Sequence, residues 1–303
     1  MPSNTLIVIV GPTAIGKTAL SIALAKTFHC PIVSADSRQF FKEMDIGTAK
    51  PTPNEMQGVP HYFINSHSIT DDYNVGKYES DAIALLEKLF QTNEKIILAG
   101  GSGLYVDAIC KGFDELPEAE PGIRNIINSI LKTDGIEGLQ KLLKELDISY
   151  YNKVDLSNPQ RLIRALEVCL TTGKPYSDFR KGRIKKRDFN TIKIGINTSR
   201  ELLYNRINQR VDDMMTKGLL EEVKSLQEYK HLNALQTVGY KELFDYLENN
   251  SDLKSAVELI KQNTRRFAKR QLTWFRRDKD IKWFEPNDVE EIMSYVNHNK
   301  VKI

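Results

Sequence analysis

The sequence GPTAIGKT, which is Gly11, Pro12, Thr13, Ala14, Ile15, Gly16, Lys17 and Thr18, matches the phosphate-binding loop pattern G-x-x-x-x-G-K-[ST] at every fixed position. The apolar run Leu6–Val10 precedes it and a helical stretch follows, so strand, loop and helix come in the required order. The glycines let successive backbone N–H groups point at one anion, the Lys17 ammonium reaches the outer phosphate oxygens, and the Thr18 hydroxyl can ligate Mg²⁺. The sequence therefore predicts that Gly11–Thr18 bind a phosphorylated compound.

The other apolar strands show how this loop is used. A nucleotide hydrolase of this fold needs an Asp at the end of a second strand to help hold the metal. The strand Lys95–Ala99 runs instead into the glycine-rich segment Gly100–Tyr105. Another strand, Pro31–Ala35, does end in a carboxylate, Asp36, which should project beside the phosphate loop where open α/β sheets place ligands. Position alone leaves two roles open for Asp36, a chemical one and that of a metal-organising or helix-capping carboxylate.

The composition is that of an ordinary globular protein. With 303 residues, 41% of them hydrophobic and 27% charged, the chain can form one large α/β domain or a core with a smaller domain. No apolar run is long enough for a signal-peptide core or a membrane span, so we expect a cytoplasmic protein without membrane association. The cysteines Cys30, Cys110 and Cys169 are widely spaced and indicate neither disulfides nor a zinc site. We also expect a monomer.

The distribution of charge is more informative than the net charge of +3. The segment Arg180–Arg187 carries six cations in eight residues. A second basic group lies on a predicted helix, where Arg266, Lys269 and Arg270 share one face. Such clusters can follow a phosphate backbone, although each taken alone is more typical of a solvated surface.

The order of strands and helices predicts the fold class. Strand-like runs at Leu6–Val10, Ile32–Ser34, Ile96–Ala99 and Ile192–Ile196 alternate with helices, which is typical of an α/β protein with a parallel sheet flanked by helices, like the P-loop NTPases. Residues 113–190 show only helical patterns. We therefore expect a core formed by residues 1–112 and 191–303, with a helical insertion domain at 113–190.

Two local patterns refine this organisation. Within the insertion, Asn158–Pro159 should begin a helix that Gly173 ends. In the last third, a helix starting at Ser199 places Arg206 and Arg210 one turn apart, so both can face one anion. The alternative is a pair of surface ion pairs with the nearby acidic residues, namely Glu201, Asp212 and Asp213.

Seven segments together resemble one family, the bacterial tRNA dimethylallyltransferases, also called tRNA isopentenyltransferases. They follow the order of that family along nearly the whole chain, and MDIGTAKP and TRRFAKRQLTWFRRD are far more specific than the phosphate loop. The matching segments are GPTAIGKT at Gly11–Thr18, SADSRQF at Ser34–Phe40, MDIGTAKP at Met44–Pro51, GGSGLY at Gly100–Tyr105, NPQRLIRALEV at Asn158–Val168, TVGYKE at Thr237–Glu242 and TRRFAKRQLTWFRRD at Thr264–Asp278.

The resemblance implies transfer of a dimethylallyl group from dimethylallyl diphosphate to the N6 amine of adenosine 37, next to the anticodon, in tRNAs that read codons beginning with U. The products are N6-(dimethylallyl)adenosine and diphosphate. The phosphate loop would then hold the donor diphosphate, with Mg²⁺ at Thr18 and with Lys17 and Arg210 neutralising the leaving group. Asp36 would be the general base. Ser102, where the family usually has Thr, would bind near the bridging oxygen of the leaving group.

The resemblance also implies contacts with the tRNA anticodon stem-loop, whose adenosine must leave the base stack to react. The insertion domain and the basic C-terminal helix would follow the tRNA backbone. The family often has Arg where Gln236 and Lys241 stand here, so these contacts should be weaker. The implied tRNA contacts are Asp36, Ser37, Arg38, Gln39, Ser102, Arg124, Gln160, Arg161, Leu162, Ile163, Arg164, Gln236 and Lys241.

Three other interpretations remain open at this point. A P-loop small-molecule kinase would use Asp36 as the base for a substrate hydroxyl. A nucleotide-regulated RNA-binding protein would explain the basic clusters and leave Asp36 without a role. An adenylate isopentenyltransferase would modify free nucleotides, although the long basic insertion and the segment Asn158–Val168 argue against it.

Overall fold

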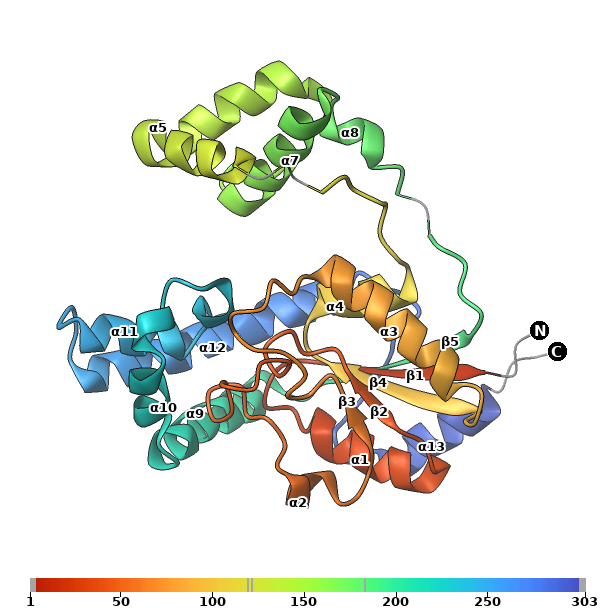
Figure 1. Ribbon diagram of the computed structural model, residues 1–303. Helices are drawn as coiled ribbons and strands as arrows, with labels where there is room; N and C mark the ends of the chain where they lie inside the picture. Colours follow the sequence, from red (N-terminus) through yellow and green to blue (C-terminus); the bar gives the residue numbers. More distant parts are fainter. Residues whose placement is uncertain (1–3, 119, 121, 183, 300–303) are drawn as a thin grey trace. The chain divides into compact units, whose positions relative to one another are not determined.

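The chain forms two compact units in the computed structural model, which describes all residues except 1–3, 119, 121, 183 and 300–303 (Figure 1). Unit 1 comprises residues 1–110 and 186–303, and unit 2 comprises residues 111–185. In the described part of the chain, no helix combines the length and apolarity needed to cross a membrane.

Unit 1 is built on a six-stranded parallel sheet with the strand order β3-β2-β4-β1-β5-β6. The central strand β1 is buried along its whole length and pairs with β4 on one side and β5 on the other. The predicted α/β class and its four strands are confirmed. The short strands β3 and β6, at the two sheet edges, were not predicted. The strands are β1 (Thr5–Val10), β2 (Ile32–Ser34), β3 (His61–Tyr62), β4 (Lys95–Gly100), β5 (Asn190–Ile196) and β6 (Lys282–Phe284).

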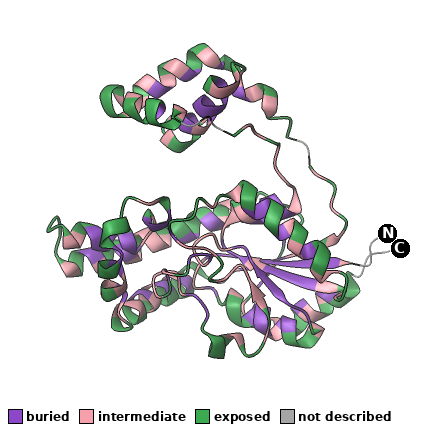
Figure 2. Ribbon diagram, in the orientation of Figure 1, coloured by how far each residue is buried: buried purple, intermediate pink, exposed green. Residues whose placement is uncertain are grey.

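Helices cover both faces of this sheet, as the buried strands require (Figure 2). Ile7 and Ile9 of β1 face a core shared with α1, α9 and α13, whereas Leu6 and Val8 face a core shared with α3 and α4. The alternation along β1 thus supplies both layers from one strand. These helices are α1 (Lys17–Phe28), α3 (Val75–Leu89), α4 (Gly103–Cys110), α9 (Arg200–Thr216) and α13 (Val289–His298).

A third core lies among the C-terminal helices of unit 1. Tyr240 and Leu243 of α11 pack there with Met44, which belongs to the long loop after β2. The helix α12 (Leu253–Phe275) contributes to all three cores of unit 1. The remaining helices of unit 1 are α2 (Pro53–Met56), α10 (Leu219–Ser225), the 3₁₀ turns Gln227–Tyr229 and Asn233–Leu235, and α11 (Tyr240–Leu247).

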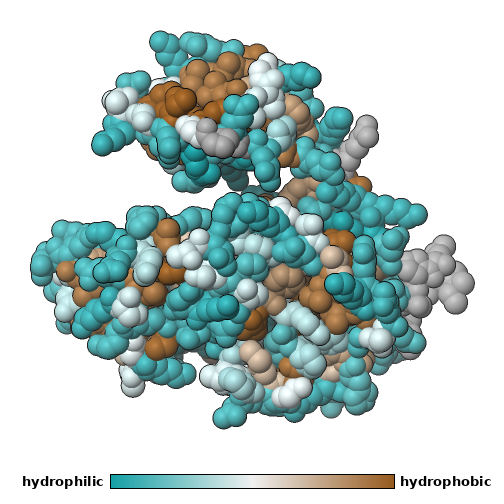
Figure 3. Space-filling view, in the orientation of Figure 1, coloured by the Kyte–Doolittle hydropathy of each residue, from teal (hydrophilic) through white to brown (hydrophobic). Residues whose placement is uncertain are grey.

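Unit 2 is helical in its described residues and has its own apolar core. The predicted start and end of its third helix are confirmed, because the Asn158 side chain accepts a hydrogen bond from the Arg161 N–H (3.2 Å) and Gly173 ends the helix in the left-handed conformation (φ 65°). Apolar residues also reach the surface of this unit (Figure 3), and Ile126 of α5 is 58% exposed. The helices are α5 (Ile123–Leu146), α6 (Ile148–Tyr151), α7 (Pro159–Thr172) and α8 (Tyr176–Phe179).

The cationic segment Arg180–Arg187 is not a uniform basic surface. Arg187 donates to the Glu79 carboxylate (2.8 Å) and to two backbone carbonyls at the end of α4 (2.7 and 2.9 Å). Only about one-tenth of either side chain is exposed (12% and 10%). The expectation that the whole cluster follows a nucleic-acid backbone is therefore wrong for Arg187. Arg183 lies outside the described residues, and Lys186 is exposed.

Replacing Arg187 with Ala should lower the free energy of unfolding of unit 1 by about 3 kcal/mol, because a buried carboxylate loses its guanidinium partner. Trp274 and Trp283, the two tryptophans of the chain, both lie in unit 1, so their fluorescence in a urea titration follows this unit alone. Lys186→Ala is the matched control and should change this free energy by less than about 0.5 kcal/mol. Superimposable curves for Arg187→Ala and the wild type would contradict the buried ion pair.

Candidate active site

The phosphate loop connects β1 to α1 and adopts the curled backbone that the sequence predicts. Ala14 (φ 62°) and Gly16 (φ 103°) are left-handed. A Cβ atom on Gly11 would lie 2.5 Å from the Ile196 carbonyl oxygen, so only glycine fits where the loop leaves the sheet. The Lys17 ammonium donates to two carbonyls of the same loop, at 3.1 and 2.8 Å. The lysine is thus folded back over the loop that it belongs to.

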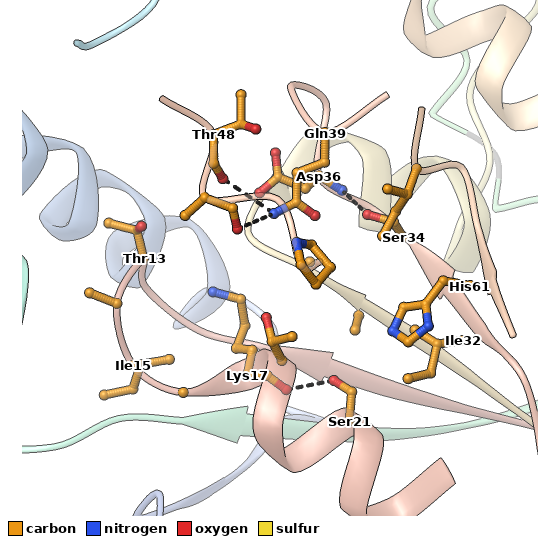
Figure 4. A pocket seen from close by; sticks show the side chains of 18 of the residues that line it. Thr13, Ile15, Lys17, Ser21, Ile32, Ser34, Asp36, Gln39, Thr48 and His61 are labelled. Carbon is orange, nitrogen blue, oxygen red and sulfur yellow. Dashed lines mark hydrogen bonds between the residues drawn. The ribbon is translucent and has the colours of Figure 1, made fainter. Parts of the chain in front are cut away.

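This loop forms one wall of a cavity of about 160 Å³ (Figure 4). The opposite wall comes from β2 and the loop that follows it, and α9 and α12 each contribute side chains. Lys17, Asp36 and Arg210 are its three charged lining residues. Apolar side chains, including Ile32, Ile64 and Phe267, share the same space. A ligand with a charged head and an apolar body matches this lining.

The two cations of the cavity are strongly desolvated. The pKa of the Lys17 ammonium is lowered to about 8, mainly by burial; Asp36 opposes this shift and Arg210 adds to it. Burial also lowers the pKa of the Arg210 guanidinium, opposed by Asp36 and Glu55. Two buried cations face a single carboxylate in this lining. A bound anion would compensate the remaining positive charge.

Asp36 lies just beyond the carboxyl end of β2, where the sequence places it. Its Oδ1 atom accepts a hydrogen bond from the Arg38 N–H (3.1 Å), which caps the turn after the strand. The same carboxylate lines the cavity with Lys17. The capping interpretation and the chemical one are therefore compatible, because the cap holds the carboxylate in place.

Ser102 is not among the residues that line this cavity. Its hydroxyl accepts from the Ser37 N–H (3.0 Å) and pairs with the Ser37 hydroxyl at the same distance. The backbone two residues before Ser102 is also tightly packed, because a Cβ atom on Gly100 would lie 2.3 Å from the Ala35 carbonyl oxygen. The glycine-rich segment thus packs closely on the loop that carries Asp36. A role for Ser102 at the leaving group stays a prediction.

On α9, the two predicted arginines differ in what they contact. Arg206 donates to the Ile15 carbonyl of the phosphate loop (3.3 Å), whereas Arg210 lines the cavity. Asp212, one of the acidic residues considered as their partners, instead lies 2.8 Å from Lys261 of α12. The helix α9 therefore supports the phosphate loop with one arginine and places the other against the cavity.

The specific segment Met44–Pro51 is held from behind by a carboxylate that sequence reasoning missed. Glu222 of α10 accepts from the backbone N–H groups of residues 45, 46 and 47 at 2.7 to 3.0 Å, and from the Tyr240 hydroxyl at 2.6 Å. The buried Lys50 ammonium binds Asp45 (2.6 Å). The segment then lines the cavity through residues 48, 49 and 51. Most of this motif is therefore structural support.

Gln271 of α12 is a second residue that sequence reasoning missed. Its side-chain carboxamide accepts from the Thr13 N–H (2.8 Å) and donates to the Gly101 carbonyl (2.9 Å), and it lines the cavity. The sequence does hold a signal for it, because helical spacing places Gln271 on the same buried face of α12 as Ala268 and Phe275. A polar residue on a buried helix face indicates a buried hydrogen-bond partner.

The tRNA contacts predicted in unit 1 fall into two groups. Arg38 is committed within the protein, since it donates to the Asn233 carbonyl (2.9 Å), and burial lowers the pKa of its guanidinium. Gln39 donates to the carbonyls of residues 48 and 49 (3.3 Å each; Figure 4). Gln236 and Lys241 are exposed, and Gln236 donates to the Lys230 carbonyl (2.6 Å).

Among the predicted contacts in unit 2, Leu162 and Ile163 have their side chains inside the unit, and a contact of either residue with tRNA stays a prediction. Both side chains are buried in the core of this unit (0% and 3% exposed), because they lie on the apolar face of α7. Gln160 and Arg161, at the start of the same helix, are exposed.

The remaining two predicted contacts in unit 2 share one buried partner. Arg124 and Arg164 lie 3.0 and 3.2 Å from the two carboxylate oxygens of Glu167, whose side chain is 2% exposed. Arg164 also donates to the Pro117 carbonyl (3.2 Å). The Glu167 carboxylate thus holds two partly exposed guanidinium groups on one surface of unit 2.

Comparison with known proteins gives consistent results. The IPP transferase family model matches residues 39–278. The chain is 55% identical over 301 residues to a tRNA dimethylallyltransferase of Flavobacterium johnsoniae, with 97% of each chain covered. It is 53% identical over 295 residues to a tRNA dimethylallyltransferase of Christiangramia forsetii, covering 97% of this chain and 98% of the relative.

Solved structures agree with these matches. The full-length tRNA isopentenylpyrophosphate transferase of Bacillus halodurans aligns with a TM-score of 0.73 and 35% identity, over 98% of this chain and 97% of that chain. A eukaryotic dimethylallyltransferase acting on tRNA aligns with a TM-score of 0.77 and 26% identity, over 99% of this chain and 78% of that chain. The chain belongs to the IPP transferase family.

Proposed function

We propose that this protein transfers the dimethylallyl group of dimethylallyl diphosphate to the N6 amine of adenosine 37 in tRNAs that read codons beginning with U. The observation that carries the proposal is the shared cavity, in which the phosphate loop and two buried cations lie with the Asp36 carboxylate. The family relatives named tRNA dimethylallyltransferase support the same chemistry.

The phosphate loop would bind the donor through its diphosphate. In the reaction the bond between the allylic carbon and the bridging oxygen breaks, and negative charge accumulates on the leaving diphosphate. Lys17 and Arg210 stabilise this charge, and they do so strongly because both are buried. The apolar side chains of the same cavity, among them Ile32 and Phe267, would contact the hydrocarbon part of the donor.

Asp36 would act on the acceptor. The lone pair of the adenine N6 amine is delocalised into the ring, so the amine needs accurate positioning and removal of a proton. As the new bond from N6 to the allylic carbon forms, Asp36 accepts the proton that N6 loses. The bond from the Arg38 N–H to Oδ1 fixes the orientation of the carboxylate for this transfer. The adenosine reaches this position only after leaving its base stack.

Mg²⁺ fits this site through Thr18. The Thr18 side chain lines the cavity, and no cluster of three His, Cys, Asp or Glu residues suited to a metal occurs in the described parts of the chain. The remaining ligands would be diphosphate oxygens and water, which is how Mg²⁺ usually binds. Bound there, the ion supplies additional positive charge to the leaving diphosphate.

The tRNA backbone would be bound by exposed cations on each unit. In unit 1 these are the stripe Arg266, Lys269 and Arg270 on α12. In unit 2 they include Arg161 and the two arginines held by Glu167. Because hydrogen bonds within the protein already occupy Arg38 and Arg187, we assign these two residues to structural support.

A transfer assay tests the proposal. The purified protein is incubated with Mg²⁺, labelled dimethylallyl diphosphate and unmodified tRNA, in parallel with AMP or ATP as the acceptor, and the nucleosides are analysed. Label on the adenine amine of tRNA alone supports the proposal. Label in free nucleotides alone would indicate an adenylate isopentenyltransferase, and ATP turnover without transfer would indicate a kinase.

Asp36→Asn should lower the rate of transfer by a factor on the order of 100 or more, because the amide cannot accept the proton. The Asn oxygen can still accept from the Arg38 N–H, so the turn and the binding of donor and tRNA should change little. Single-turnover rates, measured alongside the dissociation constants of both substrates, test this. Unchanged turnover would remove Asp36 from the mechanism.

Lys17→Ala should weaken diphosphate binding, and the size of this effect should depend on pH. The pKa of Lys17 in the free protein is about 8, so Lys17 is cationic below this pH and neutral above it. The ratio of the dissociation constants of variant and wild type should be largest near pH 6.5 and should shrink as the pH rises through 8. Calorimetric titration with inorganic diphosphate measures both dissociation constants. Protonation of the diphosphate itself affects both proteins equally and therefore cancels in their ratio. A ratio of one at pH 6.5 would contradict the assignment.

Replacing Arg266, Lys269 and Arg270 together with Ala should flatten the salt dependence of tRNA binding. Three lost phosphate contacts reduce the slope of log K against log salt by about 2. Equal slopes for this variant and the wild type would assign the stripe to the solvated surface. A control variant removes three exposed lysines of α1 and α3, namely Lys26, Lys77 and Lys88.

A further inference from the structure

The carboxamide of Gln271 joins two loops that are far apart in the sequence. Its oxygen accepts from the Thr13 N–H of the phosphate loop (2.8 Å), and its nitrogen donates to the Gly101 carbonyl of the glycine-rich segment (2.9 Å). The residue is 7% exposed, so both ends of the amide are satisfied where water is scarce. Of the natural side chains, only an amide of this length offers one acceptor and one donor in this arrangement.

The glycine-rich segment is shaped to receive α12. A Cβ atom on Gly101 would lie 2.3 Å from the Gln271 side-chain nitrogen, and one on Gly103 would lie 2.3 Å from the Trp274 ring. The Trp274 indole also donates to Asp107 of α4 (2.9 Å). Two glycines and two hydrogen-bonded side chains thus fix one short section of α12 against the site. This close approach places the carboxamide at the cavity wall.

We propose that Gln271 is a positioning residue for the diphosphate group of the donor, an inference that rests on the proposed function. The phosphate loop contains two left-handed residues and would lose conformational freedom on binding an anion. Gln271 anchors the Thr13 peptide before the ligand arrives and ties it to Gly101. The remaining N–H groups of the loop are therefore already directed at the anion.

The same side chain connects diphosphate binding to α12. The exposed stripe Arg266, Lys269 and Arg270 and the buried Gln271 lie on one helix, within two turns of each other. A shift of this helix would move the anchor of Thr13 directly. Gln271 therefore links the helix face proposed to bind tRNA with the loop proposed to bind the donor.

The test compares two variants of Gln271 with matched variants of Gln262, which is exposed on the same helix. Inorganic diphosphate is the probe, and binding is measured by calorimetry. Gln271→Ala removes both hydrogen bonds and should raise the dissociation constant roughly tenfold, which is the effect expected of two such bonds. In the transfer assay, KM for the donor should rise by a similar factor while kcat changes less. Gln262→Ala should bind as the wild type does.

Gln271→Glu separates positioning from simple packing. Its carboxylate can accept from the Thr13 N–H and cannot donate to the Gly101 carbonyl, and it adds negative charge to a cavity that already holds Asp36. At pH 7.5 it should bind diphosphate more weakly than Gln271→Ala. The wild type, with both hydrogen bonds, should bind diphosphate most tightly at this pH, Gln271→Ala less tightly and Gln271→Glu least.

Three results would overturn the inference: wild-type diphosphate affinity in Gln271→Ala, equal losses in the Gln262 variants, or diphosphate binding by Gln271→Glu as tight as that of Gln271→Ala. Should Gln271→Ala fail to fold, Gln271→Met fills the same volume without either hydrogen bond and takes its place. The two proposals fail in different ways. A wild-type protein that binds diphosphate through Lys17 and Gln271, and transfers nothing to tRNA, would refute the proposed function alone.

Discussion

Two cations, Lys17 and Arg210, are held in a desolvated position beside one carboxylate at the carboxyl edge of a parallel sheet, and this charge arrangement constrains everything around it. Desolvated cations are costly unless an anion or fixed dipoles accompany them. The surrounding structure supplies carbonyl groups for Lys17 and places Asp36 opposite. The site thus carries desolvated positive charge fixed in place for an anionic ligand, and fixed charge of this kind stabilises a leaving group most effectively.

The walls of the site are held by side chains that satisfy backbone groups from behind. Glu222 binds three successive N–H groups of the segment after β2, Gln271 binds the phosphate loop, and Arg206 binds the Ile15 carbonyl of the same loop. Each supporting residue comes from a different C-terminal helix. The last third of the chain therefore shapes a site whose reactive groups come mostly from the first third.

The sequence predicted the parts that depend on local pattern. The apolar runs located β1, β2, β4 and β5, and the loop motif located Lys17 and, with its neighbouring strand, Asp36. The edge strands β3 and β6 are two and three residues long and lack an apolar run like the one that contains β2, so no pattern indicated them. Gln271 was not predicted because its partner Thr13 is 258 positions away in the sequence. Arg187 was expected to be exposed like its neighbours, because a run of cations in the sequence does not show which side chain is buried.

The central strand β1 lies between β4, which precedes the insertion, and β5, which follows it. During synthesis on the ribosome, β1 therefore gains one neighbour early and its second only after unit 2 has emerged. Unit 2 has its own apolar core built from contacts that are close in sequence, so it can fold while the sheet of unit 1 is still half formed. The order of strands thus allows the inserted helical unit to fold before the site-bearing sheet gains its second central pairing.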